Sequence, residues 1–316
     1  MLTFSNSPAP ISKKQGEDQL PPVMPIGSVC LFATYAPSGN LPDYTRFYIK
    51  NLQSCGFILH VILSGCSVIT EDTLNFCARY GIHVSCRKNG GLDFGAWHSL
   101  AAQGVTKGAP YILLANDSVF GPFTPLQPLL QRLQANSRPA WGLVGSRAVT
   151  PHIQSWFIGF SQEVWESAAV QRVMALPFAD MSRDEIIWHG ELGLSVALTA
   201  NAIPLHTLWS DIASPLARLF PANPTHAYWR SGLRSGNIPF LKQELLRDNP
   251  YHIPKLADWR TLTPQGSDFN PAWIEEYLAQ TPQRHKTRPS NRKGRMVYYA
   301  LSQLDRYLPF SWGVKK

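Results

Sequence analysis

The sequence predicts an α/β protein built on a mostly parallel, Rossmann-like sheet flanked by helices. Short runs rich in β-branched and aromatic residues alternate with runs whose apolar residues recur at helical spacing. Four strands and three helices alternate in this way between residues 29 and 115, the pattern of consecutive βαβ units. With 316 residues, the chain can bury a large core without disulfide bridges.

The first half of the chain gives the clearest elements. Residues 29–35 form a β-rich run that ends in a loop of Pro, Ser and Gly. The helix after it begins at Asp43, a capping residue, and places Tyr44, Tyr48 and Leu52 at helical spacing. In chain order, strands are expected at 29–35, 57–63, 82–86 and 111–115, and helices at 43–55, 71–80 and 93–103.

The second half is less regular. Two further strands are expected at 141–145 and 155–160, and helical stretches at 162–175 and 182–198. Residues 213–254 are crowded with Pro, Asn, Trp and Tyr, which favours a lid or acceptor-side cap made of long loops.

The chain is expected to have one main domain with two extensions. Residues 1–26 carry five prolines and mixed charges, which predicts a disordered N-terminal segment and not a secretory signal. Residues 27–255 form the main α/β domain. Residues 256–316 form a C-terminal extension with a basic linker and an amphipathic helix, on which Met296, Tyr299, Ala300, Leu304, Tyr307 and Leu308 share one face.

Composition predicts a cytoplasmic protein, peripheral on the inner face of the membrane. No run approaches the ~20 apolar residues of a membrane-spanning helix. The five cysteines are odd in number, lie in apolar surroundings and lack CxxC spacing, so reduced core thiols are expected.

The net charge of +8 is concentrated at one end of the chain. Residues 281–316 hold nine Lys and Arg against one acid, while the remainder is balanced. This distribution argues against nucleic-acid binding and favours an anionic membrane surface as partner of residues 284–316. A disordered solubilising tail is the alternative.

The first candidate site residue is Asp117, at the end of the strand-like run 111–118. Open α/β sheets bind ligands at the carboxyl ends of their strands, and a carboxylate there can hold a divalent cation against a diphosphate. Asp117 and Ser118 can equally cap the next helix or form a turn before Gly121, and Asn116 precedes them at the strand end.

A Gly-rich segment, residues 87–97, precedes that strand. Its glycines, Gly90 among them, allow the backbone to approach a ligand closely, and Asp93 can hydrogen-bond a base, ribose or sugar. Neither a phosphate-binding P-loop nor a GxGxxG fingerprint is present, which argues against nucleotide hydrolysis and NAD chemistry.

Two residues further along add to the candidate site. Glu191 lies in a mostly apolar run, where a carboxylate is either a solvated helix residue or a general base. A lone histidine beside aromatic residues, such as His152, more often has a core or turn role.

Several of these segments together resemble the rhamnan-synthesis F family of bacterial glycosyltransferases, from about Val29 to Pro250. The segments that carry the resemblance are residues 32–35, 87–97, 114–122, 152–157, 223–226 and 239–242.

The resemblance implies a GT-A-like domain that performs an inverting displacement on a nucleoside-diphosphate sugar, such as dTDP-rhamnose. It implies that Asp117 holds Mg²⁺ or Mn²⁺ and that Glu191 is the catalytic base. The acceptor would be a cell-surface polysaccharide or a lipid-linked glycan. The implied donor-binding residues are Thr34, Tyr35, Arg87, Asn89, Gly90, Asp93, Asn116, His152 and Gln154.

One departure from the family pattern is the single carboxylate of Asn116-Asp117-Ser118, where two acids are usual. Arg87 is therefore a second candidate for stabilising the leaving group. The alternative functions are a sugar-phosphate nucleotidyltransferase, disfavoured because the loop after Tyr35 has no basic residue, and a non-catalytic carbohydrate-binding or assembly protein.

Overall fold

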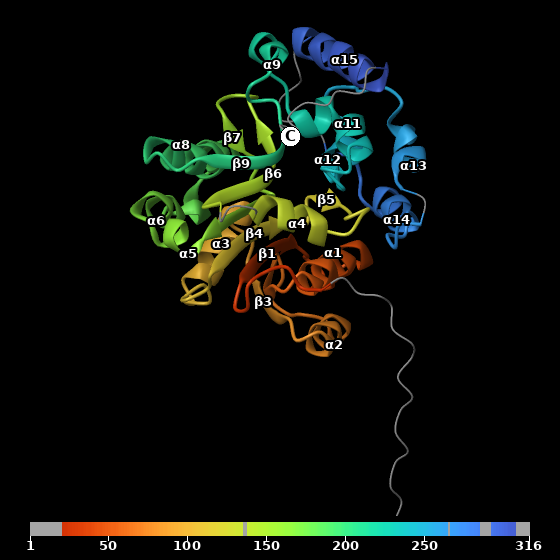
Figure 1. Ribbon diagram of the computed structural model, residues 1–316. Helices are drawn as coiled ribbons and strands as arrows, with labels where there is room; N and C mark the ends of the chain where they lie inside the picture. Colours follow the sequence, from red (N-terminus) through yellow and green to blue (C-terminus); the bar gives the residue numbers. More distant parts are fainter. Residues whose placement is uncertain (1–20, 135–137, 265, 285–291, 308–316) are drawn as a thin grey trace, which may run out of the picture.

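The computed structural model describes residues 21–134, 138–264, 266–284 and 292–307, and it contains a central eight-stranded sheet (Figure 1). The strand order is β3-β2-β1-β4-β8-β6-β7, with β9 also pairing with β6. Four of the seven strand pairings in this sheet are parallel. Helices lie on both sides, so the predicted α/β class with a mostly parallel sheet is confirmed.

The parallel part contains the four strands predicted first. They are β1 (Val29–Tyr35), β2 (Ile58–Ser64), β3 (His83–Arg87) and β4 (Tyr111–Asn116). Successive side chains of β1 enter two different cores: Cys30 and Phe32 lie in one, Leu31 and Ala33 in the other. A strand buried on both faces reads as a continuous apolar run, which is why the sequence located it.

The antiparallel part was predicted less completely. Strands β6 (Ala140–Ser146) and β8 (Phe157–Ser161) agree with expectation within two residues. The short strands β5 (Val119–Phe120), β7 (His152–Ile153) and β10 (Leu241–Lys242), and the six-residue β9 (Leu205–Ser210), were not predicted. Two-residue strands arise from tertiary pairing and have no period of their own.

One face of the sheet is covered by α3 (Leu92–Ala101), α5 (Gln162–Glu166), α6 (Ala168–Met174) and α8 (Gly193–Ala200). The opposite core contains α1 (Asp43–Ser54), part of α2 (Glu71–Arg79), α4 (Gln127–Gln134) and segments from the C-terminal third. The stretch 162–175 is divided at Ser167, whose hydroxyl accepts from the Val170 amide and caps α6. The stretch 182–198 contains α7 (Arg183–Glu185), a π-helix η2 (Ile186–Leu192) and α8.

Residues 213–254 were expected as long loops, but they contain four short helices and β10. Most of the segment is buried, and several of its side chains belong to the core below β1. The helices are α9 (Pro215–Leu219), α10 (Pro224–Ala227), α11 (Trp229–Arg234) and α12 (Gln243–Arg247).

The remaining elements, η1 (Phe178–Asp180), η3 (Leu256–Asp258), α13 (Trp259–Leu262), α14 (Ala272–Gln280) and α15 (Arg292–Tyr307), complete the fold. Ile274, Tyr298 and Leu301 from α14 and α15 are buried in the same core as α1. Residues 1–20, 285–291 and 308–316 lie outside the described residues, and with them most of the expected N-terminal segment, most of the basic linker and Leu308. Within the described residues, no helix combines the length and apolar content needed to cross a bilayer.

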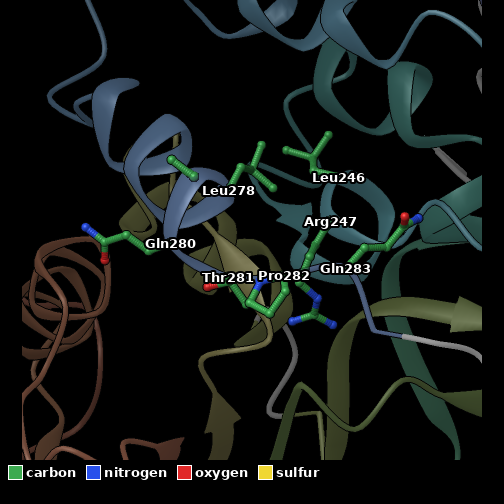
Figure 2. A pocket seen from close by; sticks show the side chains of 8 residues that line it. Leu246, Arg247, Leu278, Gln280, Thr281, Pro282 and Gln283 are labelled. Carbon is green, nitrogen blue, oxygen red and sulfur yellow. The ribbon is translucent and has the colours of Figure 1, made fainter.

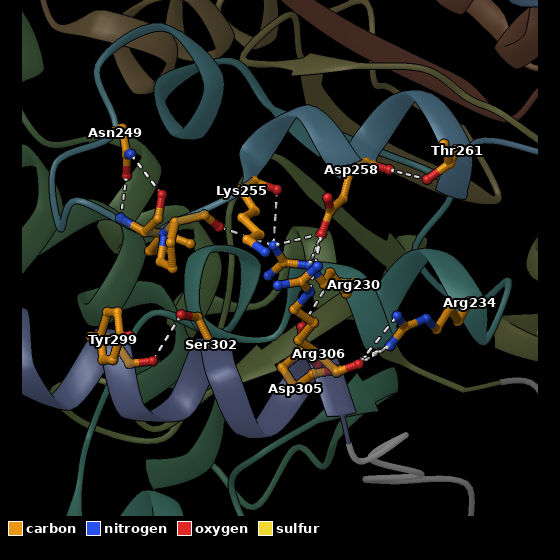
Figure 3. A network of polar contacts seen from close by, with 12 residues as sticks. Arg230, Arg234, Asn249, Lys255, Asp258, Thr261, Tyr299, Ser302, Asp305 and Arg306 are labelled. Carbon is orange, nitrogen blue, oxygen red and sulfur yellow. Dashed lines mark hydrogen bonds and ion pairs between the residues drawn. The ribbon is translucent and has the colours of Figure 1, made fainter.

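A buried polar network attaches α15 to α11 (Figure 3). The fully buried Asp305 carboxylate accepts from the backbone amides of Arg230 and Ser231, at 3.0 and 3.1 Å, and so caps the start of α11 from another helix. The Arg230 guanidinium in turn pairs with Asp258 at 3.2 Å.

Replacing Asp305 by Ala is expected to lower the free energy of unfolding by about 3 kcal/mol, because two buried amides lose a charged acceptor. Urea unfolding of the whole protein measures this difference. The matched control is Glu276→Ala, on the exposed face of α14, which is expected to stay within about 0.5 kcal/mol of wild type. Equal stability of the two variants would refute the capping role of Asp305.

Candidate active site

Asp117 directly follows β4, at the carboxyl edge of the parallel strands. Its Oδ2 accepts a 2.5 Å hydrogen bond from the Thr34 hydroxyl, at the end of the neighbouring strand β1. Both side chains are at the same edge because β1 and β4 are parallel and adjacent.

The Gly-rich segment lies at the same edge. It turns at Gly91, which has φ +70°, and leads into α3, so that Asp93 falls in the first turn of the helix. The Asn116 amide donates to Asp93 Oδ2 at 2.6 Å. The structure therefore brings the strand-end motif and the Gly-rich segment together, as the sequence analysis required.

Arg87, Asn89 and Gly90 form the outer part of this edge. Asn89 is exposed. A Cβ on Gly95 would lie 2.6 Å from the Gly90 carbonyl oxygen, so the turn at Gly90 and the helix α3 pack backbone against backbone at this point. Arg87 lies beneath them, and its Nη1 is buried without a hydrogen-bond partner among the described residues. Burial lowers the pKa of this guanidinium.

Tyr35 marks the solvent-facing side of the edge. Its ring is 55% exposed and lies against Gly65, where a Cβ would come within 2.8 Å of the ring. An exposed aromatic face beside Asp117 is suited to stacking on a nucleobase.

Glu191 reaches this region from the opposite side, on the π-helix η2. Its Oε2 accepts from the Ser155 amide at 2.9 Å and from the Ser155 hydroxyl at 2.5 Å. Its Oε1 lies 3.7 Å from His152 Nε2, and the side chain is 26% exposed. The carboxylate is thus held by Ser155 through one oxygen, has His152 near the other, and is partly exposed to solvent. π-Helical turns are frequent at functional sites.

Gln154 connects these residues to the rest of the fold. Its amide nitrogen donates to Asn223 Oδ1 at 2.8 Å, and its oxygen accepts from Trp156 Nε1 at 2.8 Å. Asn223 therefore accepts the hydrogen bond of Gln154 with its side-chain oxygen. Its backbone N–H donates to the Tyr298 hydroxyl of α15 at 2.6 Å. Gln154 therefore holds Trp156 in place, and both ends of its side chain are occupied.

Lys242 is a site residue to which the sequence analysis assigned no role. Strand β10 pairs with β5, placing Lys242 opposite Val119, two residues after Asp117. Its ammonium donates to Ser118 Oγ at 2.9 Å and lies 5.2 Å from the centroid of Trp156. The adjacent Gln243 donates its side-chain amide to the Asp117 carbonyl oxygen at 2.5 Å. In the sequence, the one indication that Lys242 belongs to the site was that residues 239–242 are among the segments that resemble the rhamnan-synthesis F family.

The charged groups act on one another. Burial, with a smaller contribution from the charge of Asp93, raises the pKa of Asp117 to about 7, while the hydrogen bond from the Thr34 hydroxyl opposes the shift. Burial also raises the pKa of Asp93 to about 6, against the effect of Lys242. Burial lowers the pKa of Lys242 to about 8, and the charges of Glu191 and Asp93 counteract part of that. Perturbed groups that converge in this way are typical of functional sites.

The donor set is compatible with a divalent cation that arrives together with a phosphorylated ligand. In the described part of the chain, no group of three or more His, Cys, Asp and Glu side chains is arranged to hold a metal. Mg²⁺, however, is usually bound by one or two carboxylates together with substrate phosphates and water. Asp117 and Asp93, whose charges act on each other, are the two carboxylates of this edge that could bind such a cation.

A separate pocket of about 550 Å³ lies between the ends of α12 and α14 (Figure 2). Its wall includes Arg247, whose Nη1 donates to the Tyr277 hydroxyl at 2.6 Å. The predicted site residues do not line it. The sheet edge is the better candidate site because it gathers the carboxylates and Lys242.

Two carboxylates and a lysine thus lie at the carboxyl edge of the parallel strands, which is where open α/β sheets bind their ligands. Residues 61–177 match the family model for rhamnan synthesis protein F. This match confirms the resemblance to the rhamnan-synthesis F family and favours a transferase role in polysaccharide synthesis.

The chain is also similar in sequence to a curated protein and in structure to a solved one. Virulence protein VirA of Vibrio anguillarum is 29% identical over 262 residues, which cover 73% of this chain and 82% of VirA. A cytidylyltransferase structure from Leptospira borgpetersenii aligns with 58% of this chain and 75% of its own, at 13% identity and a TM-score of 0.33. A similarity at that level supports no functional argument.

Proposed function

We propose that the protein is an inverting glycosyltransferase. It moves a deoxyhexose such as rhamnose from a nucleoside-diphosphate donor to a polysaccharide or lipid-linked glycan acceptor. The observation that carries this proposal is the convergence of Asp93, Asp117 and Lys242 with Glu191 at one sheet edge. Asp93, Asp117 and Lys242 would bind the phosphates and sugar of the donor. Glu191 would act on the acceptor hydroxyl.

The arrangement suggests how each side chain acts. Tyr35 stacks on the base, and Asp93 and Asn116 position the donor sugar. Asp117, together with Asp93, would hold a Mg²⁺ or Mn²⁺ ion, which supplies positive charge to the diphosphate when bound. Glu191, held by Ser155, takes the proton of the acceptor hydroxyl as that oxygen attacks the anomeric carbon from the opposite face.

A donor screen tests the proposal. The whole protein is incubated with dTDP-rhamnose and with the common UDP-, GDP- and CDP-sugars, with a synthetic lipid-linked glycan and Mg²⁺ or Mn²⁺. Release of the nucleoside diphosphate together with an extended glycan supports sugar transfer. Release of pyrophosphate from a nucleoside triphosphate and a sugar phosphate would instead identify a nucleotidyltransferase. Absence of both activities and of donor binding would identify a non-catalytic protein.

The outer face of α15 suggests contact with an anionic membrane. Met296, Tyr299, Leu304 and Tyr307 are exposed along it, whereas Tyr298, Leu301, Ser302 and Asp305 face the core. Arg292 and Lys293 lie at its start and are exposed. An apolar face flanked by basic residues is suited to the interface of a bilayer that contains acidic lipids.

The triple variant Met296→Ser, Tyr299→Ser and Leu304→Ser is expected to bind phosphatidylserine-containing vesicles at least about tenfold more weakly, because apolar area is lost from the interface. Vesicle sedimentation measures this. Substitutions are preferable to truncation because the other face of α15 is buried. Val68→Ser, an exposed apolar residue before α2, is the control. Undiminished binding of the triple variant would disprove the membrane contact.

A further inference from the structure

Lys242 is held beside Asp117 by several independent contacts. Gln243 donates its backbone amide to the Ser118 carbonyl oxygen at 3.0 Å and its side-chain amide to that of Asp117. Together with the pairing of β10 and β5, these bonds fix the backbone of Lys242 against the strand-end turn. The backbone at Lys242 is therefore held in a fixed position relative to Asp117.

The ammonium of Lys242 is partly buried and has hydrogen-bonding capacity to spare. It carries three N–H donors, and among the described residues Ser118 Oγ is the acceptor it reaches. No carboxylate of the described residues closes an ion pair on it within 4.0 Å, although Glu191 and Asp93 both act on its charge. A partly buried cation without a direct ion-pair partner is stabilised when an anion binds.

Its location between two functional groups indicates which anion that is. Asp93 marks the donor side of the edge and Glu191 the acceptor side, and Lys242 is influenced by both. In an inverting displacement, the bond that breaks lies on the donor side of the anomeric carbon, opposite the base. A donor whose diphosphate lies beside Asp117 would bring its bridging and β-phosphate oxygens close to the ammonium, because the ammonium is bonded at 2.9 Å to Ser118, the residue next to Asp117.

We propose that Lys242 binds the donor diphosphate and stabilises the negative charge that develops on the β-phosphate as the sugar leaves. This inference rests on the glycosyltransferase function proposed above. The acceptor oxygen forms the new bond to the anomeric carbon, and its proton goes to Glu191. The electron pair of the breaking carbon–oxygen bond goes to the β-phosphate, beside the Lys242 ammonium.

A purely structural role is the competing explanation. The Lys242 ammonium lies over the Trp156 ring and donates to Ser118, so removal of the side chain can disturb the turn. The two roles differ in ligand selectivity. A diphosphate-binding lysine discriminates between nucleoside diphosphate and monophosphate, whereas a structural lysine affects both equally.

Calorimetry on the whole protein separates these explanations. The probes are the tightest-binding member of dTDP, UDP, GDP and CDP, and the corresponding monophosphate. Lys242→Met keeps an unbranched side chain beside Trp156 and removes the charge. It is expected to weaken diphosphate binding by about 10- to 100-fold and monophosphate binding by less than about threefold, while Lys242→Arg retains most of the affinity.

Lys50→Met is the matched control, because Lys50 also lies over an aromatic ring, that of Tyr80 at 4.9 Å, but belongs to α1. Equal losses for both nucleotides, or no loss, would overturn the role of Lys242 and leave the proposed function intact. A wild-type protein that binds none of the diphosphates would overturn both. If Lys242→Met does not fold, Lys242→Gln provides the same comparison.

Discussion

Replacing Glu191 by Gln is expected to lower kcat for sugar transfer by about 10²- to 10⁴-fold, the usual contribution of a general base. The amide cannot take the acceptor proton, but it has the same shape, and its oxygen can still accept both hydrogen bonds from Ser155. Donor affinity should therefore stay within about twofold of wild type. Single-turnover transfer and donor calorimetry measure the two quantities.

The matched control is Glu185→Gln, one turn earlier in the chain. Glu185 is exposed and belongs to a capping box with Ser182, a role that glutamine also fills. Unchanged kcat in Glu191→Gln would place the base elsewhere. A parallel loss of donor affinity would instead show that Glu191 holds the site together and does not move a proton.

Replacing Asp117 by Asn is expected to reduce kcat/KM by at least about 10²-fold while raising the stability of the metal-free protein at pH 8. The activity loss follows from the missing negative charge, which would hold a cation against the diphosphate. The amide oxygen can still accept from Thr34, so the local fold should persist. Donor turnover with Mg²⁺ or Mn²⁺ measures the first effect.

The stability effect depends on pH in a defined direction. Burial raises the pKa of Asp117 to about 7 in the folded protein, above the unfolded value of about 3.9. The folded protein then binds more protons between these values, so the contribution of this group to the free energy of unfolding falls from about pH 4 to about pH 7 and is constant above. Thermal unfolding in EDTA should show that decline to be smaller in Asp117→Asn. A variant that is less stable than wild type at pH 8 would contradict the assigned cost of burying this charge.

Most of the parallel part of the fold could be predicted from the sequence because β1, β2 and β4 contribute side chains to the cores on both faces of the sheet. A strand with neither face exposed to solvent has a continuous apolar run in its sequence, as β1, β2 and β4 do. Asp117 and Asp93 could be placed together for a related reason, since strand ends and the helix starts that follow them share one edge of a parallel sheet.

What could not be predicted depends on contacts between distant segments. Lys242 is adjacent to Ser118 only because two two-residue strands pair across more than 120 positions, and strands so short have no recognisable period. Asp305 caps α11 from a helix some 70 positions later, where a local capping residue would normally be sought. The position of Glu191 relative to Lys242 likewise required the π-helical turn.

The contacts of α15 have a consequence for how the protein acquires activity during synthesis. Its Tyr298 hydroxyl supports Asn223, which holds Gln154 and through it Trp156, the ring beneath Lys242. The β1–β4 region leaves the ribosome far earlier, but the lysine side of the site gains this support only after Tyr298 of α15 has emerged. Nascent chains arrested before α15 should therefore lack the support of Asn223, and with it a complete lysine side of the site.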